Sequence, residues 1–321
     1  MESAASFVLL LSIVLCAHGS GARDMTEKHW TESTNTNQVK KQVDDNHPSI
    51  LRLHSMDVHI KHDNNVHDKQ DNDAHRGIHT EHVHAYPSSN MDHMDPSLFV
   101  FFRMEDLKAG KKMVIYFPHW DLSKSPKFLP REKADDIPFS SRELTNILQL
   151  FSFSRGSPQA EVMEDSLRQC EFKPIEGEIK ICATSLESML DFVSSILGLK
   201  SQIKVLATTH LTSKSNTLVQ NYTVLAAPKE ISATNLVACH RLSYPYAVFH
   251  CHSTESKIRV FKVLLAGEDG AKVYAVAVCH TDTTQWSRNH VSFRMLGTEP
   301  GLPVCHFFQA DHFVWISSPT S

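Results

Sequence analysis

A Cys-His dipeptide occurs four times within the last 83 residues of the chain. The thiol can form a disulfide and the imidazole can bind a metal ion, so each copy combines two kinds of chemistry. Ten, 26 and 24 residues separate the successive copies, and eight residues separate the last copy from Trp315. The copies are Cys239-His240, Cys251-His252, Cys279-His280 and Cys305-His306.

Alternation along a strand would sort the two side chains of a copy to opposite sides, because neighbouring residues of a strand point to opposite faces. In the second copy, Cys251 lies on one face, and His252 lies on the other face together with His250. The third copy repeats the arrangement with Cys279 and His280. The cysteines are therefore expected to pair on one face, while the histidines gather on the other.

A nitrogen-rich metal site follows from that sorting, with His240, His252, His280 and His306 as its ligands. Imidazole ligands suit copper or zinc, and of these two metals only copper is redox-active. Two alternatives remain open. One is a zinc site with mixed thiolate and imidazole ligands, although the sequence contains no Cys-x-x-Cys knuckle. The other is a packed core in which the histidines only form hydrogen bonds.

The elements that must position these residues form two groups. A helix is predicted over 143–153 with Ser141 as its cap, and the capping box Thr184-Ser-Leu-Glu187 opens a second helix that Gly198 ends. That helix has one apolar face, formed by Leu186, Met189, Leu190, Val193, Ile196 and Leu197. Strands are predicted at 98–102, 113–117, 203–209, 221–227, 246–252, 258–265 and 272–280, with a hairpin turn at Glu268-Asp269-Gly270. Helices followed by consecutive strands predict an α+β domain built on an antiparallel β-sheet.

The beginning of the chain indicates the secretory pathway. An apolar run over 7–17, broken only by Ser12 and followed by small residues, predicts a signal peptide over 1–22. The run is too short to span a bilayer, and no later stretch approaches the required length. Asn221-Tyr222-Thr223 is an N-glycosylation sequon, which fits the same route.

Six cysteines remain after the signal peptide, and an oxidising route predicts three disulfides among them. Fifteen pairings are possible for six cysteines, and proximity in the sequence favours only Cys170 with Cys182. The six are Cys170, Cys182, Cys239, Cys251, Cys279 and Cys305.

The segment 23–96 has a different composition and is predicted to be disordered, because it has few large apolar residues and no lasting periodicity. It contains ten histidines between His47 and His93, together with four Lys or Arg and seven Asp or Glu. The net charge of residues 47–93 is therefore −3 with neutral imidazoles and +7 with all ten of them protonated. We expect weak multi-site metal binding near neutral pH and, in acid, attraction to a polyanion such as pectin.

Charge also limits the functions that the whole chain can have. The 32 Lys and Arg nearly balance the 36 Asp and Glu, which argues against a dedicated nucleic-acid partner. The sequence contains no Gly-x-Ser-x-Gly elbow, no His-Glu-x-x-His helix, no phosphate-binding glycine loop and no dinucleotide fingerprint.

The spacing of the four Cys-His copies and of Trp315 resembles the BURP domain of secreted plant proteins. The resemblance covers the predicted domain 97–317 and is most similar to the dehydration-responsive branch of that family. It implies secretion to the cell wall or vacuole and a role in stress or seed development. For some members it also implies copper-dependent, autocatalytic cross-linking of a core peptide through Tyr or Trp. The segments that carry it are Phe101-Phe102, Phe128-Leu-Pro-Arg131, Ile137-Pro-Phe-Ser140, Cys182-Ala-Thr-Ser-Leu-Glu-Ser-Met189 and Tyr244-Pro-Tyr-Ala-Val-Phe249.

Two functions are compatible with this pattern. One is a non-enzymatic secreted protein whose copper-type site and disulfides are structural, and the other is a copper-dependent oxidoreductase that cross-links a peptide substrate. The cross-linking members carry a core that begins with Gln and ends with Trp or Tyr. Trp30, Tyr86 and Trp120 have no Gln at a suitable distance before them, so the first function is favoured.

Overall fold

The computed structural model describes residues 100–118, 125–198, 203–212 and 217–317. The predicted signal peptide, the histidine-rich segment, Trp30, Tyr86 and Trp120 lie outside these ranges. The described part is an α+β domain of helices and antiparallel β-strands, as the sequence predicts, and its strands form two sheets.

The larger sheet has eight strands. Six of them follow the order β1-β12-β11-β10-β6-β2, while β5 pairs with β11 and β7 pairs with β10. The predicted turn at 268–270 joins β10 to β11, and the two strands are paired from Ile258 to Ala266 of β10. The strands are β1 (Phe101–Phe102), β2 (Lys112–Tyr116), β5 (Thr209–His210), β6 (Val219–Val224), β7 (Lys229–Ile231), β10 (Ile258–Gly267), β11 (Lys272–His280) and β12 (Val304–Phe307).

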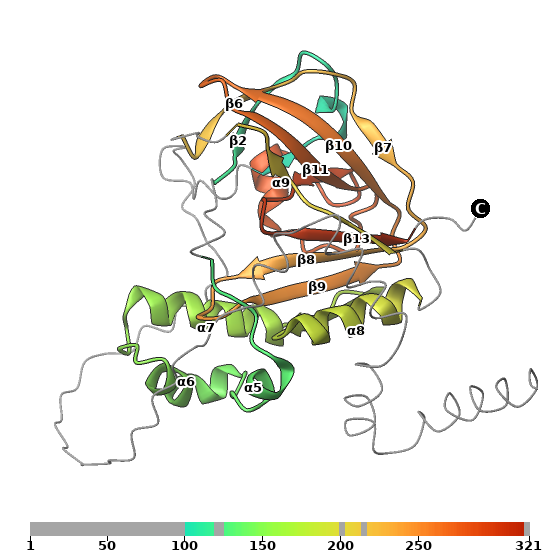
Figure 1. The fold of residues 1–321 in the computed structure, drawn as a ribbon. Helices are drawn as coiled ribbons and strands as arrows, with labels where there is room; N and C mark the ends of the chain where they lie inside the picture. Colours follow the sequence, from blue (N-terminus) through green and yellow to red (C-terminus); the bar gives the residue numbers. More distant parts are fainter. Residues whose placement is uncertain (1–99, 119–124, 199–202, 213–216, 318–321) are drawn as a thin grey trace, which may run out of the picture.

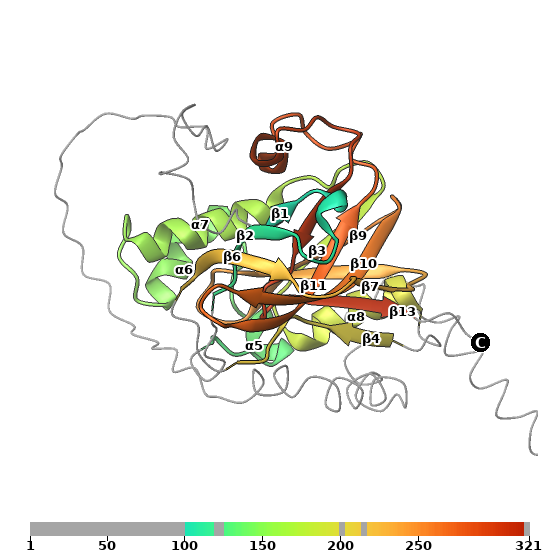
Figure 2. The same ribbon diagram turned by 90° about the horizontal axis from the view of Figure 1, so that it is seen from above.

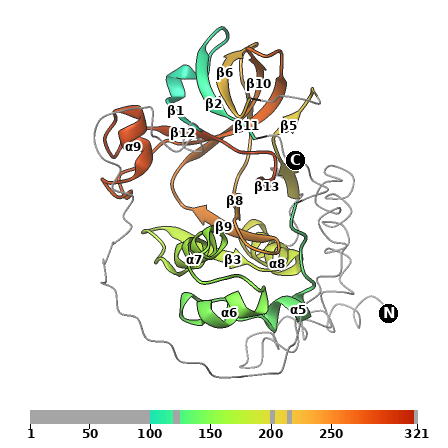
Figure 3. The ribbon, with the colours of Figure 1, turned by 90° about the vertical axis from the view of Figure 1, so that its left-hand side faces the viewer.

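The smaller sheet has five strands in the order β3-β9-β8-β13-β4. It lies between the larger sheet and the helices, so the domain is layered as sheet, sheet and helices (Figure 1; Figure 3). Figure 2 gives the view from above, in which α9 lies apart from the other helices. The strands are β3 (Glu178–Ala183), β4 (Ile203–Leu206), β8 (Leu236–Leu242), β9 (Val248–Thr254) and β13 (Phe313–Ser317), and α9 is Val291–Leu296.

The helix α8 (Leu186–Leu197) covers one face of the smaller sheet with its predicted apolar side. Met189 and Val193 are fully buried against Phe249 and Trp315. Its first turn differs from the prediction by one residue, because Ser185 is the N-cap and Ser188 completes the capping box. Gly198 ends the helix at a φ of 85°, a conformation that favours glycine.

Three further helices complete the helical layer. The predicted helix over 143–153 is shorter and spans Leu144–Leu150. A 3-10 turn, Ser141–Glu143, precedes it, and Ser140 rather than Ser141 caps that turn. A longer helix that the sequence reasoning missed begins with Ser157 as N-cap and Pro158 at the first position. Their bounds are α5 (Arg131–Asp135), α6 (Leu144–Leu150) and α7 (Pro158–Glu171).

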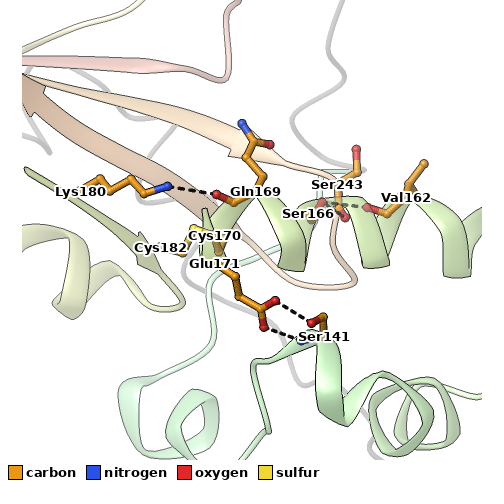
Figure 4. The surroundings of a disulfide bond; sticks show 9 residues. All are labelled: Ser141, Val162, Ser166, Gln169, Cys170, Glu171, Lys180, Cys182 and Ser243. Carbon is orange, nitrogen blue, oxygen red and sulfur yellow. Dashed lines mark hydrogen bonds between the residues drawn. A yellow bond between two sulfur atoms is a disulfide. The ribbon is translucent and has the colours of Figure 1, made fainter. Parts of the chain in front are cut away.

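A disulfide between Cys170 and Cys182 attaches the end of α7 to β3, the edge strand of the smaller sheet (Figure 4). Next to it, Glu171 accepts hydrogen bonds from the backbone N–H and the hydroxyl of Ser141, at 2.8 and 2.6 Å. These contacts connect α7 to the turn before α6. The helical layer is thus attached to the sheet covalently as well as by packing.

Candidate functional site

Two disulfides lie within the strand pairs that carry the Cys-His dipeptides. Cys239 in β8 is directly opposite Cys251 in β9, and Cys279 in β11 is directly opposite Cys305 in β12. Each pair is bonded across a Cα–Cα distance of 4.0 Å and is fully buried. With Cys170–Cys182, the described residues contain the three disulfides that the cysteine count predicts.

The cysteines lie on the faces of the two sheets that point away from each other. Cys239 and Cys251 pack in the core beneath α8, while Cys279 and Cys305 pack in the core of the larger sheet. Their strand neighbours Ala238 and Val278 instead belong to the core between the two sheets. The histidine of each dipeptide lies on this second side, so the alternation of the sequence becomes a separation in space.

The four dipeptide histidines come together in one cavity of about 580 Å³ between the sheets. His240 and His252 are contributed by the smaller sheet, and His280 and His306 by the larger sheet. The ring centroid of His240 lies 5.4 Å from that of His252 and 5.7 Å from that of His306. His280 and His306 are stacked at 5.5 Å with an interplanar angle of 12°.

Three further histidines line the same cavity, and the sequence reasoning did not include them in the site. His250 is directly opposite His240 in the β8–β9 pair, and its ring lies 5.4 Å from that of His252. His290 caps α9, and His312 lies one residue before β13. Only His250 had a sequence signal, because it shares a strand face with His252.

A tryptophan and a glutamate complete the cavity wall. Trp286 lies between His280 and His290, with ring centroids at 4.9 and 4.5 Å. Oε1 of Glu178 in β3 is 3.1 Å from Nδ1 of His252. The cavity therefore has imidazoles from both sheets, an oxidisable indole and a carboxylate.

Burial favours the neutral form of His240, His250, His280 and His306. It lowers the pKa of His280 to about 3 and that of His250 to about 4. Burial, with neighbouring histidines as a second cause, holds the pKa of His240 and that of His306 well below the usual value. A neutral imidazole has one nitrogen with a free lone pair, which is the form that binds a metal ion.

The imidazole nitrogens in the cavity are suitable metal ligands, although the histidine rings are arranged in pairs. Nδ1 of the buried His280 and Nε2 of His250 have no hydrogen-bond partner among the described residues. Within the same ranges, no group of three or more His, Cys, Asp or Glu side chains is spaced as a ready metal site. A single ion held by the four dipeptide histidines would thus require their rings to move closer together.

The predicted glycosylation residue lies away from this cavity. Asn221 is within β6, opposite Val114 of β2. Its Nδ2 donates a hydrogen bond to Oε2 of Glu268 at 3.1 Å. Attachment of a glycan at Asn221 remains a prediction. None of the helices in the described ranges has the length and apolar character needed to cross a membrane.

Comparison with known proteins identifies the relatives of the chain. Residues 100–317 match the family model described as the BURP domain. BURP domain-containing protein BNM2C of Brassica napus is 45% identical over 228 residues, which are 70% of this chain and 81% of that protein. BURP domain protein USPL1 of Arabidopsis thaliana is 43% identical over 70% of this chain and 81% of that protein. BURP domain protein RD22 of Arabidopsis thaliana is 42% identical over 70% of this chain and 57% of that protein. This chain belongs to the BURP domain family of plant proteins.

Proposed function

We propose that the histidine cavity between the two sheets is a copper-type metal site in a secreted protein of the cell wall or vacuole, associated with stress or seed development. The observation that carries this proposal is the convergence of His240, His252, His280 and His306 on one cavity from two different sheets. Three disulfides and membership of this family support the secretory pathway.

Different residues of the chain would bind the metal, fix the strands that carry its ligands and orient one of those ligands. The four dipeptide histidines would supply neutral ring nitrogens, and the disulfides next to them in sequence would fix the strands that carry them. Glu178 would orient His252 through Nδ1 and leave its Nε2 for the cavity. A bound copper ion would supply one-electron redox chemistry.

Copper titration of two forms of the protein tests the site. The full chain and a chain starting at Ser97 should bind copper with similar affinity, because the cavity belongs to the described domain. His252→Ala or His280→Ala should weaken binding by about 10–100-fold or more. A matched change in the histidine-rich segment, His59→Ala with His62→Ala, should have little effect. Binding that disappears with residues 23–95 would reject the proposal.

The second candidate is a copper-dependent oxidoreductase that cross-links Tyr or Trp of a peptide. One observation favours it, namely that the oxidisable ring of Trp286 lines the same cavity as the histidines. Such a cross-link removes two hydrogen atoms from the peptide as two protons and two electrons, which dioxygen would accept. The chain has no Gln-led core, and therefore we rank this function second.

Intact mass tests whether the protein is its own cross-linking substrate. The protein is measured with its disulfides reduced, before and after incubation with copper and dioxygen. We expect no loss of hydrogen and no cyclic peptide after proteolysis. A cross-linked fragment containing Trp30, Tyr86, Trp120 or Trp286 would place the second function first.

A further inference from the structure

A buried carboxylate lies behind the histidine cavity. Asp311 is 1% exposed, and neither of its carboxylate oxygens has a hydrogen-bond partner among the described residues. Oδ2 is 3.7 Å from Nε of Arg241, and Oδ1 is 3.7 Å from Nε2 of His312. The guanidinium of Arg241 is itself buried and balances the charge of the carboxylate.

His312 connects this carboxylate to the cavity. Its Nε2 is the ring nitrogen nearest Asp311, while its Nδ1 lies 3.3 Å from Nδ1 of His240 and is hydrogen-bonded to it. The two imidazoles are perpendicular, with ring centroids at 5.2 Å. Asp311, His312 and His240 therefore form one row that ends at a predicted metal ligand.

The charge of Asp311 decides where the protons of this row lie. A neutral imidazole has one N–H and one lone pair. A carboxylate attracts an N–H and repels a lone pair even beyond hydrogen-bond distance, so Nε2 of His312 carries the proton. Nδ1 of His312 can then only accept, and the hydrogen bond between the two rings requires Nδ1 of His240 to be the donor. The lone pair of His240 is left on Nε2.

We propose that Asp311 and His312 are positioning residues that fix His240 in its Nδ1-protonated tautomer and so reserve its Nε2 for a ligand in the cavity. Burial supports this arrangement because it lowers the pKa of both imidazoles and keeps them neutral. The assignment of tautomers stands without a metal. Its consequence for metal affinity rests on the proposed function.

The tautomers are measured in the metal-free full chain, with ¹⁵N-labelled histidine and long-range ¹H–¹⁵N correlation at neutral pH. We expect a protonated Nδ1 and an unprotonated Nε2 for His240, and the reverse for His312. Signals are assigned by their loss in His240→Gln and His312→Gln. Nε2-protonated His240 in the unaltered protein would overturn the proposal, whether or not any variant folds.

A variant tests the role of the carboxylate. In Asp311→Asn the side-chain amide can donate to Nε2 of His312, which favours the other tautomer of His312 and removes the acceptor that holds His240. The share of Nε2-protonated His240 should therefore rise. Glu178→Gln is the matched control, because Glu178 contacts His252 and not His240. An unchanged His240 tautomer in folded Asp311→Asn would contradict the proposal.

Copper affinity separates this inference from the proposed function. If the cavity binds copper, Asp311→Asn should weaken binding by about 10–100-fold, the usual effect of losing an outer partner of a ligand. If the unaltered protein binds no copper while the tautomers are as expected, the proposed function fails and the positioning role stands. If copper binds but His240 has the other tautomer, the proposed function stands and the positioning role fails.

Discussion

Nδ1 of His252 lies 3.1 Å from Oε1 of Glu178, and both side chains are mostly buried in the cavity between the sheets. Burial favours the protonated acid, but hydrogen bonds from His252 and from the backbone N–H of Ile175 hold the pKa of Glu178 below its usual value. The ionised carboxylate directs the N–H of His252 to Nδ1. A second dipeptide histidine, besides His240, thus has an outer partner.

Loss of this partner should weaken the metal site. Glu178→Ala is expected to lower copper affinity by about 10–100-fold, because the ring of His252 is no longer held in one tautomer and orientation. Glu178→Gln keeps an oxygen acceptor and should lose less. Competition with a chelator of known affinity measures both. Glu230→Ala, which removes an exposed ion pair with Arg259, is the control. Equal affinities for Glu178→Ala and the unaltered chain would reject a role of Glu178 in the site.

The disulfides should differ in their effect on the metal. Removing Cys279–Cys305 or Cys170–Cys182 by paired Ala substitutions should each lower the free energy of unfolding by roughly 2–5 kcal/mol. Only the first pair lies next to His280 and His306, so only its removal should also weaken copper binding. Chemical unfolding and copper titration measure the two effects. Equal losses of copper affinity in both variants would mean that the disulfides act on the site only through global stability.

The metal-free protein should lose stability in acid. His250 and His280 titrate near about 6.5 in the unfolded chain, whereas burial lowers their pKa to about 4 and about 3 in the folded protein. Below about 6.5 the unfolded chain therefore binds more protons, and the stability present at neutral pH is lost as the pH falls towards the folded values. Each group contributes a slope of at most roughly 1.4 kcal/mol per pH unit.

Urea unfolding of the chelator-treated protein at neutral and mildly acidic pH measures this slope. His280→Asn cannot titrate and should show a flatter dependence on pH than the unaltered protein. A variant with the same slope would assign the acid sensitivity to other groups.

The histidine-rich segment predicts a separate response to pH. Retention of the full chain on immobilised polygalacturonate should rise as the pH falls through the histidine range, because the segment changes from net negative to net positive. Added salt should reduce this retention. A chain starting at Ser97 should not show the rise. Retention that depends on neither pH nor the segment would reject pectin as a partner.

Local periodicity explains what could be predicted from the sequence. The apolar face of α8 and the opposite placement of Cys279 and His280 follow from the repeats of a helix and a strand. α7 is not among the predicted helices, although Ser157 and Pro158 form a common helix-opening pattern. Thr184 and Ser185 can both cap a helix, and therefore the sequence pattern alone predicts the capping box of α8 one residue too early.

The composition of the cavity could not be obtained in this way. Glu178 lies beside His252 through the pairing of β3 with β9, and His312 lies beside His240 through the pairing of β13 with β8. His290 reaches the cavity from the start of α9. No local pattern encodes these placements, because they join segments that are far apart in the sequence. The pairing of Cys239 with Cys251 also depends on strand register. The number of cysteines does not determine this pairing, whereas the antiparallel register of β8 and β9 places Cys239 directly opposite Cys251.

Both sheets contain in their interior a strand from the region 304–317. β12 lies between β1 and β11, and β13 lies between β8 and β4. During synthesis, neither sheet can close before these residues have left the ribosome, and His306 and His312 are among the last site residues to emerge. The histidine cavity between the sheets is therefore complete only after the region 304–317 has paired in both of them, which makes its assembly depend on contacts between residues far apart in the sequence.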